Sequence, residues 1–408
     1  MHPLPFSSAL GSAPRLQIFV SDLNATGVVR NAIVIANQAS ASGYDARLLT
    51  CRSGGVLLDQ VDPGVTIVEL GGASDHGNRH ARQRRALLAY RRHIRDWQPH
   101  IMLSAGNHGH LLSCLAWAGA PGTKMVRISN DPGHGAARSS RLTRARRNLK
   151  LRLIGALSDK LVLVSPALAA HPYLDSRLRI GRAIFIPNGV DVELVRRNAA
   201  EPAPHLWLSD RSIPTILAVG RHSKQKNFPT LLRAFAAARQ ARPLRLMFLG
   251  DGDPAARDEL RRMAVELDVA DSVSFVSATP NPFPYMARAS MVALPSLWEG
   301  SSNVLLEAMA CGTPVVASIT AGDASHLLDH GRFGILFEPR NEEALAGAIL
   351  RQAGPNPVMP GDRAMQFHRG STLNSYLALF RSAMPARSGH AVVPQPASLP
   401  PQVIAKVG

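Results

Sequence analysis

Two carboxylates seven residues apart stand in the segment "PSLWEGSSNVLLEAMACGTPVVAS", residues 295–318. Glu299 lies in a stretch rich in Pro, Ser and Gly, whereas Glu307 lies in an apolar run. The pattern predicts a turn followed by a helix over about 303–310. Asn303 and Glu307, four residues apart, would then share one helix face, since such residues are neighbours on a helix. Glu307 is therefore predicted one turn behind the helix start and Glu299 just ahead of it.

The start of this predicted helix is a candidate anion site. Its first N–H groups, those of Ser302, Asn303 and Val304, have no partner within the helix, and the helix dipole favours negative charge there. Gly300 would let the backbone approach a ligand closely. A phosphate at this point would leave Glu307 to accept hydrogen bonds from a ribose diol and Glu299 to bind whatever the phosphate carries.

Two cations follow a predicted strand over residues 215–220, namely Arg221 and Lys226. Cations at the carboxyl end of a strand are suited to holding a diphosphate and stabilising the charge that it gains on leaving. An exposed Arg and Lys in a loop are more often simple surface, so this pair alone is weak evidence.

The elements that must position these residues fall into two series. Strand and helix patterns alternate over residues 15–190 and again from residue 215, which indicates βαβ units and parallel sheets. The predicted fold class is α/β, with two Rossmann-like, doubly wound domains facing across a cleft, where ligands bind outside the carboxyl ends of the strands. The predicted organisation is a flexible start (1–14), an acceptor domain (15–191), a polar linker (192–212), a donor domain (213–360), a helical segment that packs back on the body (361–385) and a disordered tail (386–408).

Several segments of the second half together resemble family 4 retaining glycosyltransferases, which have the GT-B fold. The resemblance covers most of residues 184–340 and rests on "IPNGVD", "VGRHSKQKNFPTLLRAF", "FLGDGD", "VSFVS" and the segment with both glutamates. It implies transfer of a hexosyl group from a nucleotide-diphosphate sugar to a hydroxyl, in surface polysaccharide or lipid-linked glycan synthesis. By the same resemblance, Arg221 and Lys226 bind the diphosphate and Glu307 binds the ribose. Glu299 binds the transferred sugar, and it is a catalytic candidate together with Arg221 and Lys226. By this resemblance no metal is needed, because the Arg/Lys pair and the helix start replace it, and no cofactor is needed, because the nucleotide sugar is a co-substrate.

The first half departs from the family pattern. The family usually has a Gly-Gly loop after its first strand, where "SDLNATGVV" supplies Gly27 as the donor-binding glycine. Where many members carry an acidic residue late in the second domain, "TAGDASHLL" places His326 nearby. A cleft histidine is expected after the fourth strand, and we favour His108 as this catalytic residue over His110 and His134. These departures leave the sugar and the acceptor open.

The chain is strongly basic, with 46 Lys and Arg against 29 Asp and Glu and a formal net charge of +17. Much of the excess lies in two segments, residues 79–96 and 138–153, which have helical patterns. Such helices could bind an anionic membrane surface through their arginines, or they could be solvated faces. Nucleic acid is not expected as a partner, because aromatic residues are 5% of the chain and Tyr90 alone stands among the basic residues of these two segments.

Three further observations bear on location. No apolar run approaches the roughly 18 residues of a spanning helix, and the first residues lack the pattern of a signal peptide. The three cysteines are scattered, without metal-ligand spacing, so a reducing compartment is favoured. We therefore predict a cytoplasmic protein that binds the inner face of the cytoplasmic membrane if its basic helices dock there.

Two other interpretations use the same fold. A nucleotide-sugar epimerase would bring acidic and histidine groups from both domains onto the sugar, and the second half alone supplies convincing candidates. A degenerate, non-catalytic binding subunit is disfavoured by the complete set of Arg221, Lys226, Glu299 and Glu307. A serine hydrolase is disfavoured because no G-x-S-x-G turn is present.

Overall fold

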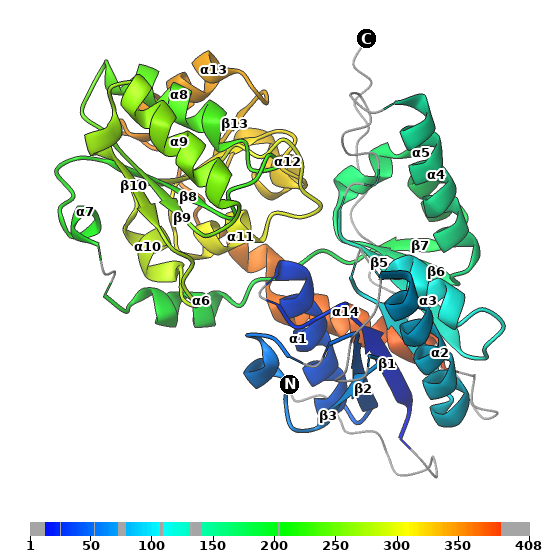
Figure 1. Cartoon of the computed structure of the whole chain (residues 1–408). Coiled ribbons are helices and arrows are strands. Elements are labelled where there is room, and N and C mark those ends of the chain that lie inside the picture. Colours follow the sequence, from blue (N-terminus) through cyan, green and yellow to red (C-terminus); the bar gives the residue numbers. More distant parts are fainter. Residues whose placement is uncertain are drawn as a thin grey trace.

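The computed structural model describes residues 13–384, apart from residues 25, 53, 72–78, 107–108, 131, 133–139 and 203–204 and the side chains of 79–84. Most of the segments 1–14 and 386–408 therefore lies outside the described residues. The described chain forms two parallel sheets, one from each half of the sequence (Figure 1).

The N-terminal half alternates strands and helices in the order expected of βαβ units. Its elements are β1 (Arg15–Phe19), α1 (Gly27–Ala41), β2 (Asp45–Thr50), η1 (Leu58–Gln60), β3 (Val65–Glu69), α2 (Arg79–Trp97), β4 (Ile101–Ser104), α3 (His110–Ala116), β5 (Thr123–Ile128), α4 (Arg141–Ala156), β6 (Lys160–Leu163), η3 (Pro166–Ala170), α5 (Pro172–Arg179) and β7 (Ala183–Phe185). The seven strands pair in parallel in the order β3-β2-β1-β4-β5-β6-β7. Strands β1, β4 and β6 are almost wholly buried, as parallel strands covered by helices on both faces should be.

The C-terminal half repeats this plan with six strands. Its elements are α6 (Val192–Ala199), α7 (Leu206–Ser209), β8 (Thr215–Val219), α8 (Phe228–Arg239), β9 (Arg245–Leu249), α9 (Pro254–Glu266), η4 (Ala270–Ser272), β10 (Val273–Val276), α10 (Phe283–Arg288), β11 (Met291–Leu294), α11 (Asn303–Ala310), β12 (Val315–Ser318), α12 (Ala324–Leu327), η5 (Asp329–Gly331), β13 (Ile335–Phe337), α13 (Glu342–Gln352), η6 (Arg363–Phe367) and α14 (Arg369–Ser382). The strand order is β10-β9-β8-β11-β12-β13. The two doubly wound α/β domains predicted from the sequence are confirmed.

The strand order decides which loops can meet. Strand β11 pairs in parallel with β8 on one side and with β12 on the other. The carboxyl ends of these three strands therefore lie side by side at one edge of the sheet. The loops that leave them carry residues 220–227, 295–302 and 319–323, so the topology brings the predicted cations and carboxylates together.

The segment between the sheets is more structured than its polar sequence indicates. It contains the short helices α6 and α7, and Val192, Val195 and Leu208 are buried in the core of the second domain. Part of the predicted linker, residues 192–212, is thus packed against that domain. Three spaced apolar residues are enough to anchor it.

The last helix, α14, returns to the first domain. Tyr376, Leu377, Leu379 and Phe380 are buried in the same core as residues of α1 and β1. Figure 1 shows this helix, in orange, lying across the N-terminal lobe beside α1. The N-terminal core is therefore completed by residues from the far end of the chain.

This returning helix makes a stability prediction. Phe380 is fully buried, so Phe380→Ala should lower the free energy of unfolding by about 3–5 kcal/mol through lost burial and a residual cavity. Urea unfolding followed by circular dichroism would measure the loss. The exposed neighbour Asn374 offers a matched control, since Asn374→Ala should change stability by about 0.5 kcal/mol or less. Equal effects of the two changes would show that α14 is not part of the core.

Candidate active site

The predicted cation and carboxylate of the second domain meet directly. Lys226 Nζ donates to Glu299 Oε1 at 2.9 Å, and the two side chains are 15% and 14% exposed. Glu299 also accepts from Ser296 Oγ at 2.9 Å and from Gln225 Nε2 at 3.1 Å. The carboxylate is therefore held by three donors from two loops. Gln225 and Ser296, next to predicted residues in the sequence, were not identified from it.

The loop that carries Lys226 is fixed to the neighbouring loop at several points. Gln225 Nε2 donates to Trp298 O at 2.9 Å, and its own carbonyl accepts from Leu297 N at 2.9 Å. Asn227 adopts a left-handed conformation (φ 53°) and its amide donates to Pro295 O at 3.2 Å. Arg221 lies exposed at the start of this loop. Lys226 is thus rigidly placed, whereas Arg221 extends from the same strand end into solvent.

Helix α11 begins at Asn303, as predicted, but its first N–H groups are not all available. Ser302 N donates to Asp323 Oδ1 at 2.9 Å, and Ser301 Oγ donates to Asp323 Oδ2 at 2.8 Å. The prediction that the Ser302 N–H is a free donor for an anion was therefore wrong. The reason is a buried carboxylate from the loop after β12, which occupies that donor. Asn303 and Val304 remain as the predicted donors at the helix start.

Asp323 is the acidic residue of this region, and it was not predicted from the sequence. It lies in "TAGDASHLL" and is 3% exposed. Burial raises the pKa of its carboxyl to about 6, and the hydrogen bonds from Ser302 and Ser301 oppose that rise. His326 is exposed instead, with its ring packed edge-on against Phe367. Asp323, rather than His326, is therefore built into the turn that precedes α11.

The two domains touch at the start of α11. Asn188 Nδ2, between β7 and α6, donates to Asn303 Oδ1 at 2.8 Å. Gly27, the first residue of α1, lies against the Asn303 amide so closely that any side chain at that position would collide with it. Two residues predicted to bind the donor, Gly27 and Asn303, are thus brought together from different domains.

Gly300 lies at the contact between the two domains. A Cβ at this position would overlap the carbonyl oxygen of Ser129, which directly follows β5. The missing side chain therefore allows close packing of the second domain on the first, and the predicted close approach of a ligand at Gly300 stays a prediction.

Glu307 lies one turn inside α11 and is partly buried. Burial raises the pKa of its carboxyl to about 7, and the positive charges of Arg30, Arg369 and Lys226 oppose the rise. None of the described residues forms a hydrogen bond to this carboxylate. A carboxylate with open acceptor positions, surrounded by cations from both domains, is suited to accept hydrogen bonds from a diol.

Two family profiles match successive parts of the chain. The profile described as Glycosyltransferase Family 4 matches residues 25–194, and the profile described as Glycosyl transferases group 1 matches residues 213–353. The first range covers the first sheet from α1 onward, and the second range covers the whole second sheet. Lys226, Glu299 and Glu307 all lie within the second range. The chain belongs to the family 4 glycosyltransferases.

Curated relatives of this glycosyltransferase match over part of their length. One is the N-acetylgalactosamine-N,N'-diacetylbacillosaminyl-diphospho-undecaprenol 4-alpha-N-acetylgalactosaminyltransferase of Campylobacter jejuni, 36% identical over 158 residues, which are 39% of this chain and 40% of the relative. Another is the lipopolysaccharide core biosynthesis glycosyltransferase LpsE of Rhizobium meliloti, 30% identical over 176 residues, 41% of this chain and 50% of that one. The alignments thus span half or less of these relatives.

Solved structures extend the likeness to the whole fold. Anabaena HepE in complex with UDP and glucose superposes with a TM-score of 0.73 at 18% identity, over 90% of this chain and 100% of HepE. Sucrose-phosphate synthase from Thermosynechococcus elongatus superposes with a TM-score of 0.70 at 20% identity, over 90% of this chain and 98% of the synthase. At these identities the likeness establishes the GT-B fold.

Of the three candidate histidines in the first domain of the glycosyltransferase, the structure describes one. His108 and His134 lie outside the described residues. His110, at the start of α3, is 3% exposed, and its Nδ1 lies 2.8 Å from Ser104 Oγ at the end of β4. His108 therefore remains a prediction for the cleft histidine. In the part of the chain that the structure describes, no three His, Cys, Asp or Glu side chains are grouped to hold a metal ion, and metal independence likewise remains a prediction.

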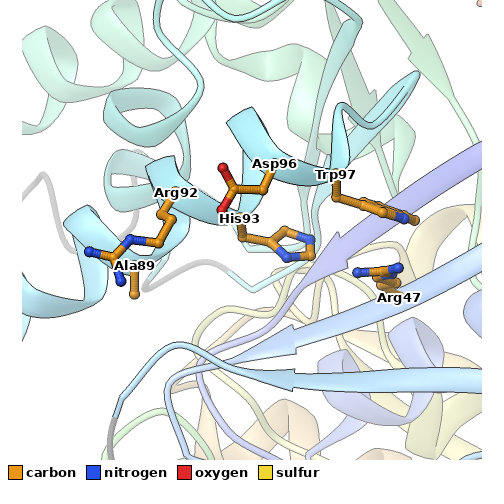
Figure 2. A pocket seen from close by; sticks show the side chains of 6 residues that line it. All are labelled: Arg47, Ala89, Arg92, His93, Asp96 and Trp97. Atoms are coloured by element: carbon orange, nitrogen blue, oxygen red, sulfur yellow. The ribbon is translucent and has the colours of Figure 1, made fainter.

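A separate pocket lies elsewhere on the first domain. It has a volume of about 440 Å³ and is lined by Arg47, Ala89, Arg92, His93, Asp96 and Trp97. Figure 2 shows the Arg47 guanidinium facing the Trp97 ring, at 4.1 Å from its centroid. None of the predicted site residues lines it. The contact fastens the end of α2 to β2, as cation–π stacking at a half-buried site should.

The raised pKa of Glu307 makes a pH-dependent prediction. A folded-state pKa of about 7 against the ordinary 4.5 means that the folded chain holds this proton more tightly than the unfolded one. The contribution of this tighter proton binding to the free energy of unfolding is complete below about pH 4.5 and is lost as the pH rises through about 7. Glu307→Gln should therefore flatten the decline in melting temperature of the unliganded protein between about pH 5 and 8.

The same variant should bind a nucleoside diphosphate less tightly. Losing the charge-assisted bonds to a ribose costs about 1.5–3 kcal/mol, and the deficit should be greatest above pH 7, where the wild-type carboxylate is ionised. Calorimetry and thermal melts at several pH values would measure both effects. Glu266→Gln on the exposed face of α9 is the control and should leave both curves unchanged. Unaltered nucleotide affinity in Glu307→Gln would show that Glu307 does not contact the nucleotide.

Proposed function

We propose that the protein transfers a sugar, with retention of anomeric configuration, from a nucleotide-diphosphate sugar to a hydroxyl of a glycan or lipid-linked acceptor. The observation that carries this proposal is the arrangement at the edge of the second sheet. A rigidly held Lys226–Glu299 pair stands ahead of the α11 N-terminus, and an open, cation-surrounded Glu307 stands one turn behind it. This order matches the order of sugar, diphosphate and ribose in such a donor.

In this reaction the bond between the anomeric carbon and the diphosphate oxygen breaks, and a bond from the acceptor oxygen to that carbon forms. The diphosphate leaves with the electron pair, and its oxygen takes up the proton that the acceptor hydroxyl loses. Lys226 and Arg221 would stabilise the charge that develops on the diphosphate, since preorganised cations act most strongly where charge appears in the transition state. The N–H groups of Asn303 and Val304 would add the helix-start contribution. Glu299 would accept hydrogen bonds from the hydroxyls of the sugar.

The acceptor class rests on the relatives. The Campylobacter jejuni protein is named for an undecaprenol-diphosphate-linked glycan, and the Rhizobium meliloti protein for the lipopolysaccharide core. HepE was solved with UDP and glucose. These names support an acceptor in cell-surface glycan synthesis and a nucleotide-sugar donor for this chain.

An anionic membrane surface is proposed as the place of the reaction. The first ten residues of α4 are all exposed, and they include four arginines. Leu142, Leu149 and Leu153 on the same helix are 61%, 68% and 41% exposed. Basic residues next to exposed leucines suit a helix that lies in a lipid headgroup region. Among the described residues, no helix is both long and apolar enough to cross a membrane.

The second basic helix, α2, has the same combination on a smaller scale. Leu88 is 55% exposed, and the arginines near it in the sequence, Arg85, Arg91 and Arg92, are exposed as well. This helix would add charge to the same attachment without being its main contact.

The donor proposal predicts both binding and loss of turnover. UDP-, GDP- or ADP-sugars should raise the melting temperature of the wild-type protein, because a ligand that binds the folded state stabilises it by mass action. With the sugar nucleotide so identified, Arg221→Ala combined with Lys226→Ala should lower turnover by about 10²–10³-fold at saturating donor. Lys224→Ala, an exposed lysine of the same loop, is the matched control and should keep full activity. Full turnover in the double variant would end the proposed role of the pair.

The membrane proposal predicts salt-sensitive binding to vesicles. Sedimentation with liposomes should rise with the anionic lipid fraction and fall steeply with salt, because exposed charges are screened within about 8 Å at physiological ionic strength. Replacing Arg141, Arg144, Arg146 and Arg147 with Gln should abolish sedimentation and leave transfer to a soluble acceptor analogue intact.

Its control removes the same charge from the other domain. Four of the exposed arginines there are Arg262, Arg332, Arg340 and Arg351, and their replacement with Gln should leave sedimentation unchanged. If both quadruple variants lose binding equally, net charge rather than α4 is responsible. If the wild type ignores anionic liposomes at low salt, the basic helices are solvated faces.

A further inference from the structure

A buried arginine of the first domain has no evident reason to be charged. Arg127 lies on β5, in the middle of an apolar parallel sheet, and is 1% exposed. Among the described residues it forms no ion pair with a carboxylate. Its Nη1 also has no hydrogen-bond partner there. Burying a charge without a counter-ion is costly, so stability alone does not account for an arginine at this position.

Arg127 donates hydrogen bonds to two side chains, one on the C-terminal helix and one in the connection between the domains. Its Nε donates to the Tyr376 hydroxyl at 3.1 Å, on the returning helix α14. Its Nη2 makes a short bond to Asn188 Oδ1, in the connection between the two domains. Asn188 then uses its amide Nδ2 to donate to Asn303 Oδ1 at 2.8 Å. A continuous polar chain thus runs from the C-terminal helix through β5 and the interdomain connection to the start of α11.

This series of hydrogen bonds ends at the proposed donor site. Asn303 opens the helix whose first turn is the proposed diphosphate site, and Glu307 follows one turn later on the same face. The Arg127 bond leaves the Asn188 side chain with its oxygen occupied, so its nitrogen is directed at Asn303. A neutral, apolar side chain at 127 would leave Asn188 free to turn.

The surroundings of Arg127 leave little other space for a partner. A cavity of about 10 Å³ adjoins it, lined also by Asn31, Asn188, Arg369 and Tyr376, which is room for about one water molecule. A water there could satisfy Nη1 but would not neutralise the charge. The fixed geometry of the guanidinium fork, which bonds two partners at a set angle, is the property that this site uses.

We propose that Arg127 is a positioning residue for donor binding: through Asn188 it orients Asn303, and with it the N-terminus of α11, across the interdomain joint. This inference rests on the proposed function, because it assigns Arg127 to the site that binds the nucleoside diphosphate. Arg127 itself is not a catalytic residue, since it acts on the ligand through two intervening side chains.

The test separates positioning from structural support. Calorimetry with UDP, GDP and ADP identifies the nucleotide that the wild type binds. Arg127→Met should weaken its binding about fivefold to tenfold, as expected for loss of one coupled interaction. Its melting temperature should change little, because removal of an unneutralised buried charge offsets the loss of the hydrogen bonds to Tyr376 and Asn188. The KM for the sugar nucleotide should rise in parallel, with kcat changed less.

A double-mutant cycle with Asn303→Ala identifies the route. If Arg127 acts through Asn303, then Arg127→Met should cause no further loss of affinity in the Asn303→Ala background. Tyr376→Phe, which removes the partner on the side away from α11, is the control and should keep nucleotide affinity within about twofold. Should Arg127→Met fail to fold, Arg127→Lys, which keeps the charge and lacks the fork, takes its place with the same expected loss.

The outcomes are distinguishable. The positioning role is overturned if Arg127→Met binds the nucleotide as tightly as the wild type. It is also overturned if Arg127→Met lowers the nucleotide affinity equally in the wild-type and Asn303→Ala backgrounds. Either result leaves the proposed function standing. A lowered melting temperature with unchanged affinity assigns Arg127 to stability and also overturns the proposal. Absence of binding of all three nucleotides by the wild type overturns the proposed function and this inference with it.

Discussion

The ion pair between Lys226 and Glu299 joins two loops that are 73 residues apart in the sequence. It is possible because β8 and β11 are neighbours in the second sheet and end at the same edge. Both side chains are mostly shielded from water, so the attraction between them is stronger than at an exposed surface, and each would be costly to leave unpaired. Together with the hydrogen bonds of Gln225 and Ser296, the pair holds the two loops against each other.

The two other carboxylates near the pair, those of Asp323 and Glu307, differ in burial and in their hydrogen bonds. Asp323 is enclosed and its oxygens are occupied by Ser301 and Ser302, so it acts as a structural anchor for the turn before α11. Glu307 accepts no hydrogen bond from any described residue, and its pKa is about 7 because burial outweighs the attraction of three nearby cations. Hydrogen-bond donors on a bound ligand would lower this pKa and favour the ionised carboxylate.

Periodic and local features of the sequence predicted the fold and the helix that carries two of the candidate site residues. Alternating apolar segments indicated two parallel α/β domains, and the spacing of Asn303 and Glu307 placed both on the first turns of a helix that does begin at Asn303. The sequence analysis missed contacts whose partners come from another strand or another domain. The Ser302 N–H, predicted to be free, donates to a carboxylate 21 residues away, and Gly300 packs against the end of β5. Neither contact leaves a local signal in the sequence.

The role proposed for Arg127 could not be predicted from the sequence either. Within "KMVRIS" it is one more basic residue in a basic chain. Only its place on β5, which pairs with β6, shows that it lies in the sheet interior.

The position of α14 has a consequence for the order in which the chain can fold during synthesis. The core of the first domain includes Tyr376, Leu377, Leu379 and Phe380, yet the last strand of that domain, β7, ends at Phe185. The ribosome must add roughly 200 further residues before α14 is complete, which takes on the order of 10–40 seconds at about 5–20 residues per second. During that time the second domain emerges whole, while the apolar face of α1 that α14 will cover stays open to water and to other chains. The domain that is made first is therefore the domain that is finished last.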